Sequence, residues 1–318
     1  MYTEFYGLRE QPFRLTPDPR FVHLAAPHSA ALNALLFNVI LRKGFAVVTG
    51  PVGSGKTTLV HTLLELLAQR RVGKSDCASA LIVNPTLARD EFFELLLDEF
   101  EIQCKSTSKS QRLLALEKMF REVDRRDGTC VLFVDEAHLL SLELLEEIRL
   151  LSNVDTPRGK LLQVILLGQP ELLPLLDQPA TRALKQRIAT RCQIRPLTLQ
   201  ETRVYVVERL VAAGLAGPSP FSATSIDTIH VYAQGIPRLI NLMCDACLSI
   251  GFQAQRKRVE SEIAHEAAAL LDLKEAPAEA EEVERLVIGK PIVSEPAQPS
   301  ALDHLIKAMK QRLTEVRA

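Results

Sequence analysis

Residues 50–57 read Gly50-Pro-Val-Gly-Ser-Gly-Lys-Thr57. This octet follows a short apolar run at residues 45–49, and helical spacing resumes over residues 57–67. Glycines permit a tight turn and a close approach of phosphate oxygens, while the start of the helix adds partial positive charge. Because the octet lies between a strand and a helix, a chance glycine-rich turn is the weaker interpretation. The pattern predicts a P-loop that binds a nucleotide.

The octet also predicts individual roles in binding ATP and Mg²⁺. Lys56 places a point charge on the β- and γ-phosphates, and Thr57 can give its hydroxyl group to Mg²⁺. The residues expected to bind the nucleotide are Gly50, Gly53, Ser54, Gly55, Lys56, Thr57 and Thr58.

A pair of acids, Asp135-Glu136, follows the apolar residues 131–134. Asp135 is therefore expected at the carboxyl end of a strand, where open α/β sheets bind ligands, and it is the second predicted Mg²⁺ residue beside Thr57. Glu136 is free to act as general base on an attacking water. The alternative is an acidic pair at the start of a solvated helix. His138 completes Asp-Glu-Ala-His, a tetrapeptide also found in helicases, but no further helicase motif follows and His138 receives no role.

Gln169 ends an apolar run at residues 161–167. A polar side chain at that strand end could reach the γ-phosphate or the attacking water. Since polar residues at strand ends are ordinary, a turn-capping amide is the alternative.

A run of basic residues without any acid extends from position 182 to position 195, and its members are Arg182, Lys185, Arg187, Arg191 and Arg195. Such a run is usually a solvated face or a nucleic-acid patch. Here it is expected to precede a fifth strand at residues 192–195, beside the nucleotide edge of the sheet. An arginine supplied by a neighbouring subunit stabilises phosphoryl transfer in some nucleotide hydrolases. Arg187 is the first candidate and Arg191 the second, with a structural role left open.

Arg238 lies in Gly235-Ile-Pro-Arg238, which opens a helical pattern. A guanidinium there could fold over the nucleotide and report the presence of its γ-phosphate. The alternative is an arginine in solvent at the start of a helix.

The chain alternates strands and helices up to Pro196 and then continues with helical patterns alone to about residue 273. This order predicts a mostly parallel sheet covered on both faces, followed by an all-helical domain. The expected divisions are an N-terminal linker segment at 1–28, an α/β nucleotide-binding domain at 29–196, a helical lid at 197–273, a disordered linker at 274–300 and an amphipathic helix at 301–318.

Composition narrows the range of partners. The formal net charge of −1 gives no global attraction to nucleic acid, and aromatic residues make up only 5% without any tryptophan, too few for a stacking platform.

Six scattered cysteines suit a reducing compartment, and Cys244-Asp-Ala-Cys247 has no second pair with which to hold a metal. No secretory signal begins the chain and no apolar run reaches the ~20 residues of a membrane span. A cytoplasmic protein is expected, and any attachment to a membrane would be through a partner.

Taken in order, these motifs resemble an AAA+ ATPase and, more closely, the ExeA/GspA family, general secretion pathway protein A. The resemblance covers about residues 1–270 and is carried by Met1-Tyr-Thr-Glu-Phe-Tyr-Gly-Leu8, Pro12-Phe13, Thr16-Pro-Asp-Pro-Arg-Phe21, His28, Gly44-Phe45, the P-loop, Val134-Asp-Glu-Ala-His138, Gly168-Gln-Pro-Glu-Leu172, Gln186-Arg187 and Gly235-Ile-Pro-Arg238. It implies an α/β P-loop core with a parallel five-stranded sheet, an all-helical lid and a ring-like homo-oligomer. It also implies sensor roles for Gln169 and Arg238, and a finger role for Arg187.

Two functions follow from this resemblance. The first is an ATP hydrolase that drives or switches the assembly of an envelope secretion, pilus or polysaccharide-export machinery. The second is a regulator of transposition that binds double-stranded DNA, because transposition helper ATPases resemble the same core. The net charge favours the first, whereas the basic run and Gln255-Arg-Lys-Arg258 keep the second open.

Overall fold

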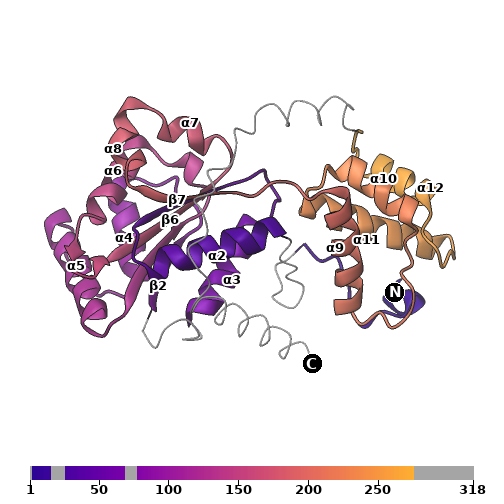
Figure 1. The fold of residues 1–318 in the computed structure, drawn as a ribbon, viewed down its shortest axis with the longest axis horizontal. Coiled ribbons are helices and arrows are strands. Elements are labelled where there is room, and N and C mark those ends of the chain that lie inside the picture. Colours follow the sequence, from indigo (N-terminus) through magenta and orange to yellow (C-terminus); the bar gives the residue numbers. More distant parts are fainter. Residues whose placement is uncertain (1, 16–25, 69–76, 276–318) are drawn as a thin grey trace, which may run out of the picture. The chain divides into compact units, whose positions relative to one another are not determined.

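Five short strands form one parallel sheet (Figure 1). The strands are β1 (Phe45–Thr49), β2 (Cys77–Ile82), β3 (Thr129–Val134), β6 (Leu162–Gly168) and β7 (Ile188–Gln193), in the order β2-β3-β6-β1-β7. All four strand pairings are parallel. Every residue of β1 and β6 is buried, as expected for central strands covered on both faces. The predicted parallel five-stranded sheet is confirmed.

This computed structural model of the chain describes residues 2–15, 26–68 and 77–275. All of them lie in one compact unit, Met1–Glu275. Most of the predicted linker at 274–300 lies outside the described residues. The whole of the predicted helix at 301–318 and the whole Thr16–Phe21 motif also lie outside them.

The sheet is covered by helices that follow or precede its strands. The longer ones are α2 (Ala26–Ile40), α3 (Lys56–Ala68), α4 (Arg89–Glu99), α5 (Lys109–Arg125) and α6 (Leu142–Leu151). Short elements complete this layer: η2 (Ala137–Leu139), β4 (Asp155–Thr156), β5 (Gly159–Lys160), α7 (Leu172–Leu176), η3 (Pro179–Thr181) and α8 (Arg182–Lys185). Helices α4, α5 and α6 and the short elements η2, α7 and α8 pack with the sheet around one hydrophobic core that includes Phe45, Phe92, Phe120, Leu132 and Leu166.

The fifth strand differs from its predicted position at residues 192–195, because β7 starts at Ile188. The sequence pattern missed its first half because β7 is an edge strand, whose residues alternate between half-buried and exposed rather than forming an apolar run. Only the first part of the basic run, Arg182, Lys185 and Arg187, therefore precedes the strand. Arg187 immediately precedes β7, while Arg191 lies within it and is exposed.

A second, all-helical layer follows the sheet. It consists of α9 (Leu199–Ala212), α10 (Ala223–Ala233), α11 (Pro237–Gln253) and α12 (Ser261–Leu270), with a single isolated bridge between Phe221 and Val259 in this part of the described chain. These helices bury a separate hydrophobic core around residues such as Ile240, Met243 and Leu248. The predicted helical lid is confirmed as a fold element.

The N-terminal segment packs into this second core. Helix α1 (Tyr2–Tyr6) contributes both tyrosines, and Phe13 lies edge-on to Phe221 with ring centroids 6.0 Å apart. The guanidinium of Arg209 donates from Nε to the carbonyl oxygen of Pro12 at 2.7 Å. Residues 2–13, expected as part of a linker at 1–28, therefore contribute to the structure of the helical layer.

Candidate nucleotide-binding site

The P-loop connects β1 to α3 and has a backbone that requires glycine. Gly53 and Gly55 have φ angles of +77° and +93°, a region that other residues rarely adopt. A Cβ atom at Gly53 would lie 2.7 Å from Cβ of Arg238, and one at Gly55 would lie 3.0 Å from Nε2 of His28. The loop is thus closely bordered by the lid on one side and by the start of α2 on the other.

Lys56 is the first residue of α3 and is only 6% exposed. Its Nζ donates to the carbonyl oxygens of Gly50 at 2.8 Å and Pro51 at 3.0 Å. Burial lowers the pKa of Lys56, while the nearby carboxylates of Glu136, Asp135 and Glu171 act in the opposite direction. The ammonium group therefore lies inside the P-loop among acidic groups, where a phosphate could replace its carbonyl partners.

Thr57 and Asp135 are brought together by the fold. The Thr57 hydroxyl donates to Oδ2 of Asp135 at 2.8 Å, and the Glu136 N–H donates to Oδ1 of the same carboxylate at 2.9 Å. Asp135 is held at the end of β3 by its own N–H, which donates to Ile82 of the neighbouring strand at 2.8 Å. The two residues predicted to bind Mg²⁺ are therefore direct neighbours, and hydroxyl and carboxylate oxygens are the donors that such a hard cation prefers.

Two further polar atoms at this site are buried without a hydrogen bond among the described residues. They are Oγ of Ser54 and Oε2 of Glu136. A buried polar atom left unsatisfied costs about 1–3 kcal/mol, so such atoms are rare in a folded protein unless a ligand or water satisfies them. Glu136 also has a left-handed backbone, with φ of 49°. These unsatisfied groups fit a site that accepts a phosphate ligand with its cation and water.

His138 lies between the end of β6 and the carboxylate of Glu136. The backbone N–H of Gln169 donates to Nδ1 of His138 at 3.4 Å, and that nitrogen lies 3.4 Å from Oε2 of Glu136. The predicted sensor Gln169 and the predicted base Glu136 are thus joined by a histidine to which the sequence assigned no role. The only sequence signal for it was its place in Asp-Glu-Ala-His.

Arg238 lies beside the P-loop, as a lid sensor would require. Its backbone N–H donates to the carbonyl oxygen of Gly53 at 3.3 Å, and its side chain starts directly over that glycine. Ile236, two residues earlier in the same motif, also borders Gly53. Arg238 as a whole residue is exposed to solvent.

No described contact joins the two finger candidates to the P-loop. Arg187 donates from Nη1 to the carbonyl oxygen of Arg149 at 3.3 Å and also to Oδ1 of Asn153, both at the end of α6. Arg191 is exposed on the edge strand β7. Within one chain, these arginines are surface groups on the side of the sheet that β7 closes.

Sequence reasoning missed His28 as a site residue. Its Nε2 lies 2.7 Å from the carbonyl oxygen of Ser54, and since a carbonyl only accepts, this nitrogen carries the proton. His28 is buried against the P-loop, although it is far from the octet in sequence. In the sequence it stands out only as one of the residues that carry the family resemblance.

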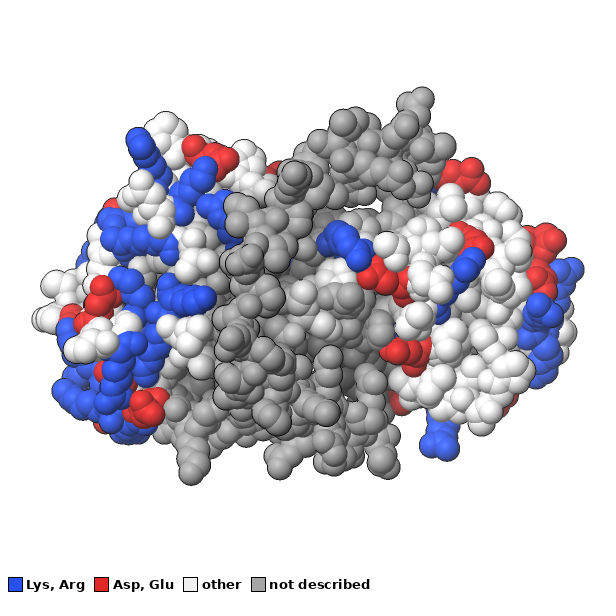
Figure 2. Space-filling model, viewed as in Figure 1, with Lys and Arg blue, Asp and Glu red and all other residues white. Residues whose placement is uncertain are grey.

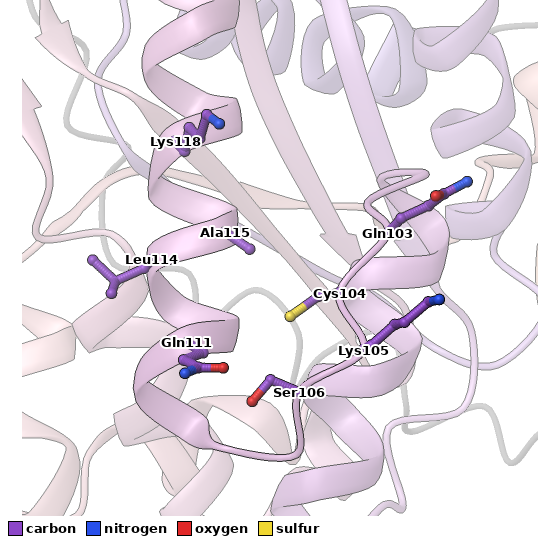
Figure 3. A pocket seen from close by; sticks show the side chains of 8 residues that line it. All are labelled: Gln103, Cys104, Lys105, Ser106, Gln111, Leu114, Ala115 and Lys118. Atoms are coloured by element: carbon purple, nitrogen blue, oxygen red, sulfur yellow. The ribbon is translucent and has the colours of Figure 1, made fainter.

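Two other features of the described residues carry no candidate site. An open hollow lies between the loop at 103–106 and α5, and Figure 3 shows that its lining comes from these two segments and includes none of the predicted site residues. Cys244 and Cys247 are buried free thiols of α11, and burial raises the pKa of Cys247 to about 12. Across residues 2–15, 26–68 and 77–275, no group of three or more His, Cys, Asp or Glu residues could hold a metal, and no helix is long and apolar enough to cross a membrane.

A P-loop after β1, an acidic pair after β3 and a helical lid define the class of AAA ATPases. In agreement, the family model described as "AAA domain" matches residues 40–176. The chain is 38% identical over 253 residues to General secretion pathway protein A of Aeromonas hydrophila, an alignment that covers 79% of this chain and 45% of that protein. The chain belongs to the GspA-type family of AAA ATPases, and it spans less than half the length of this relative.

Solved structures with the same fold have much lower sequence identity. The Drosophila ORC bound to DNA aligns with a TM-score of 0.63 and 18% identity, over 89% of this chain and 68% of that one. The ORC2 protein of Aeropyrum pernix aligns with a TM-score of 0.61 and 14% identity, over 86% and 74% of the two chains. At these identities the likeness concerns the fold alone.

Proposed function

We propose that this chain binds and hydrolyses ATP, and that the nucleotide drives or switches the assembly of an envelope secretion, pilus or polysaccharide-export machinery. The observation that carries the first half is the convergence of Lys56, Thr57, Asp135 and Glu136 at one end of the sheet. The second half rests on the relative named General secretion pathway protein A, which aligns with 79% of this chain.

The chemistry would use a small number of groups. The P-loop N–H groups and Lys56 would bind the phosphates, and Oγ of Ser54 would gain a partner there. Thr57 and Asp135 would hold Mg²⁺, which when bound supplies charge neutralisation at the β- and γ-phosphate oxygens. Glu136 would take the proton of the attacking water through its carboxylate, and Gln169 would orient that water from the neighbouring strand end.

Arg238 would contact the bound nucleotide and so link its presence to the position of the lid. Its backbone is tied to Gly53, and Leu197, which leads into the lid, donates its N–H to the carbonyl oxygen of Gly235 at 2.8 Å. A change at the P-loop would therefore reach the Gly235–Arg238 segment and the start of the lid together.

Arg187 or Arg191 would act on the nucleotide of a neighbouring subunit. Both lie at the β7 side of the described unit without a contact to its own P-loop, which supports action in trans within a homo-oligomer, as the resemblance to ring-forming ATPases implies. The assembly would be cytoplasmic and would reach the inner membrane through its partners.

Binding of double-stranded DNA is the alternative, with a role in transposition. Part of the basic segment that favours it already has partners within the chain. Lys257 donates to the carbonyl oxygen of Phe5 and lies 3.7 Å from the centroid of its ring, and Arg258 pairs with Glu260 at 2.8 Å. Figure 2 shows Lys and Arg side chains outnumbering acidic ones on the sheet-containing part of the visible face, whereas both kinds are interspersed on the helical part. The secretion role is preferred because the net charge of the chain is −1 and because of the relative named General secretion pathway protein A.

The test is ATPase activity of the full chain, measured with and without double-stranded DNA, together with mass photometry of the oligomers. Wild-type protein is expected to hydrolyse ATP without stimulation by DNA. Glu136→Gln keeps the size of the side chain and loses the basic carboxylate, so it should bind ATP but lose turnover by ~10²-fold or more. Lys56→Ala should weaken binding itself. Turnover by Glu136→Gln at the wild-type rate would refute the assignment of the base, and strong stimulation by DNA would favour the transposition role.

A further inference from the structure

One ring nitrogen, Nδ1 of His138, lies between two groups that the proposed reaction uses. It is 3.4 Å from the backbone nitrogen of Gln169 and 3.4 Å from Oε2 of Glu136. The histidine side chain is largely shielded from solvent, with 11% exposure, and Oε2 of Glu136 is buried. Nδ1 therefore accepts a hydrogen bond from the Gln169 N–H and lies within reach of Oε2 of Glu136, which has no hydrogen bond among the described residues.

The two partners require opposite states of this nitrogen. The Gln169 N–H can only donate, so Nδ1 must present its lone pair, and the proton of the neutral ring is then on Nε2. An ionised Glu136 can only accept, so Nδ1 must carry the proton to bond it. One nitrogen cannot satisfy both groups at the same time.

The state of Nδ1 determines whether the Glu136 carboxylate receives a hydrogen bond from His138. When Nδ1 accepts from Gln169, the ring gives no hydrogen bond to the carboxylate, which is then available to a water. When Nδ1 carries the proton, the ring can donate to Oε2 of Glu136, and the Gln169 N–H after β6 loses its acceptor. The orientation of the base is thus linked to the backbone that carries the predicted sensor, through a single short side chain.

We propose that His138 is a positioning residue that couples the end of β6 at Gln169 to the orientation of the Glu136 carboxylate. The inference rests on the proposed function, in which Glu136 is the base of ATP hydrolysis. His138 does not touch the nucleotide in this scheme. It determines whether Glu136 is held by the protein or available to the attacking water.

The kinetic test compares two amides that place their polar atoms differently. His138→Asn can present an oxygen or nitrogen near the position of Nδ1, whereas His138→Gln places its amide near the position of Nε2. We expect His138→Asn to keep kcat within ~3-fold of wild type, and His138→Gln and His138→Ala to lower kcat by ~10-fold or more, because small misplacements of a catalytic group have effects of this size. The dissociation constant of ATP should change less than ~2-fold, since the P-loop is untouched.

Two results of these measurements would overturn the inference. One is a kcat for His138→Ala equal to that of wild type. The other is an equal loss in the Asn and Gln variants, which would mean that the place of the nitrogen is irrelevant. His61→Ala provides a matched control, because this histidine is exposed on the P-loop helix α3 and should leave kcat unchanged.

A spectroscopic test does not depend on hydrolysis. The nucleotide-free chain, labelled with ¹⁵N-histidine, contains seven histidines, and the His138 resonances are assigned by their loss in His138→Asn. Long-range ¹H–¹⁵N correlation at mildly alkaline pH should show His138 as the neutral tautomer with its proton on Nε2, as the bond from Gln169 demands. A proton on Nδ1 in this state would overturn the inference.

Failure of the inference can be told apart from failure of the proposed function. If wild-type protein has no ATPase activity, or Glu136→Gln hydrolyses ATP normally, the proposed function fails and the coupling has no reaction to serve. If wild type is active, Glu136→Gln is inactive and His138→Ala matches wild type, only the coupling role of His138 is wrong.

Discussion

The sheet-containing part and the helical layer differ in whether their buried polar side chains have hydrogen-bond partners. In the described helical layer, buried polar side chains bond to one another or to the backbone: Tyr205 donates to Asn241 at 2.9 Å, and Arg209 donates to Tyr205 at 3.0 Å. In the sheet-containing part, Ser54 and Glu136 keep buried oxygen atoms without a hydrogen bond among the described residues. Among the described residues, the helical layer satisfies its buried polar side chains by itself, whereas the end of the sheet keeps oxygen atoms that a ligand or water could satisfy.

The largest expected effect is that of replacing Arg187, which has no described contact with the P-loop of its own chain. Arg187→Ala should lower ATP turnover by ~10³-fold or more if the guanidinium acts on a neighbouring subunit, with nucleotide binding nearly unchanged. Mixing it with Glu136→Gln protein should restore some activity, since a mixed interface pairs an intact Arg187 with an intact Glu136.

The matched control for this variant is Asn153→Ala, which removes the partner of Arg187 at the end of α6. If Arg187 only stabilises the end of α6, Arg187→Ala and Asn153→Ala should lose the same amount of activity. No recovery in mixed oligomers whose co-assembly has been demonstrated would argue against action between subunits.

The two hydrophobic cores can be compared by one phenylalanine from each. Phe13, in the N-terminal segment, and Phe93, in α4, are 2% and 0% exposed. Replacing either with alanine should lower the free energy of unfolding by about 3 kcal/mol or more. Because the two residues belong to separate cores, we expect Phe13→Ala to lower the thermal transition of the helical layer and Phe93→Ala that of the sheet. Calorimetry would show this, and identical single transitions in both variants would contradict the separation.

The contact between lid and P-loop is tested by Gly53→Ala. The new Cβ atom would adopt an unfavourable backbone conformation and approach Arg238 to 2.7 Å. A left-handed backbone costs a non-glycine residue about 1 kcal/mol, and the clash adds to it, so ATP should bind ~10-fold more weakly or worse. Gly217→Ala in the lid is the control, because a Cβ atom added there would meet nothing within 4 Å. Equal affinities in the two variants, measured by calorimetric titration, would contradict a tight lid contact.

The smallest effect concerns the capping of α9, where the lid begins. The side chain of Arg195 lowers the pKa of Glu201 to about 2 from an ordinary 4.5, and Glu201 forms a capping box with Thr198. Because the folded-state pKa is depressed, this carboxylate stabilises the fold above about pH 4.5, and the contribution is lost as the pH falls toward 2.

Glu201→Gln should therefore lower the free energy of unfolding by about 1 kcal/mol at pH 7 and by progressively less in acid. Urea denaturation at several pH values measures this difference. Glu262→Gln in the first turn of α12 is the control, because no side-chain bond caps that helix. A constant difference between Glu201→Gln and wild type across the acid range would contradict the assigned cause.

Local signals in the sequence were enough to predict several elements. The octet at 50–57, the acidic pair after residue 134 and the motif at 235–238 each lie within one strand end or one helix start. The P-loop, the proposed Mg²⁺ residues and the proposed sensor Arg238 could therefore be predicted from spacing. The parallel sheet and the helical layer followed from alternating periodicities in the same way.

Contacts between segments that are distant in the sequence became visible with the fold. His138 meets Gln169 because β3 and β6 are neighbours in the sheet, His28 meets Ser54 because the start of α2 lies against the P-loop, and residues 2–13 join a core formed mostly by residues after 196. The early start of β7 was hidden for a related reason, since an edge strand has no apolar run to mark it. Such contacts depend on which strands and helices become neighbours, and the local pattern of residues carries no record of that arrangement.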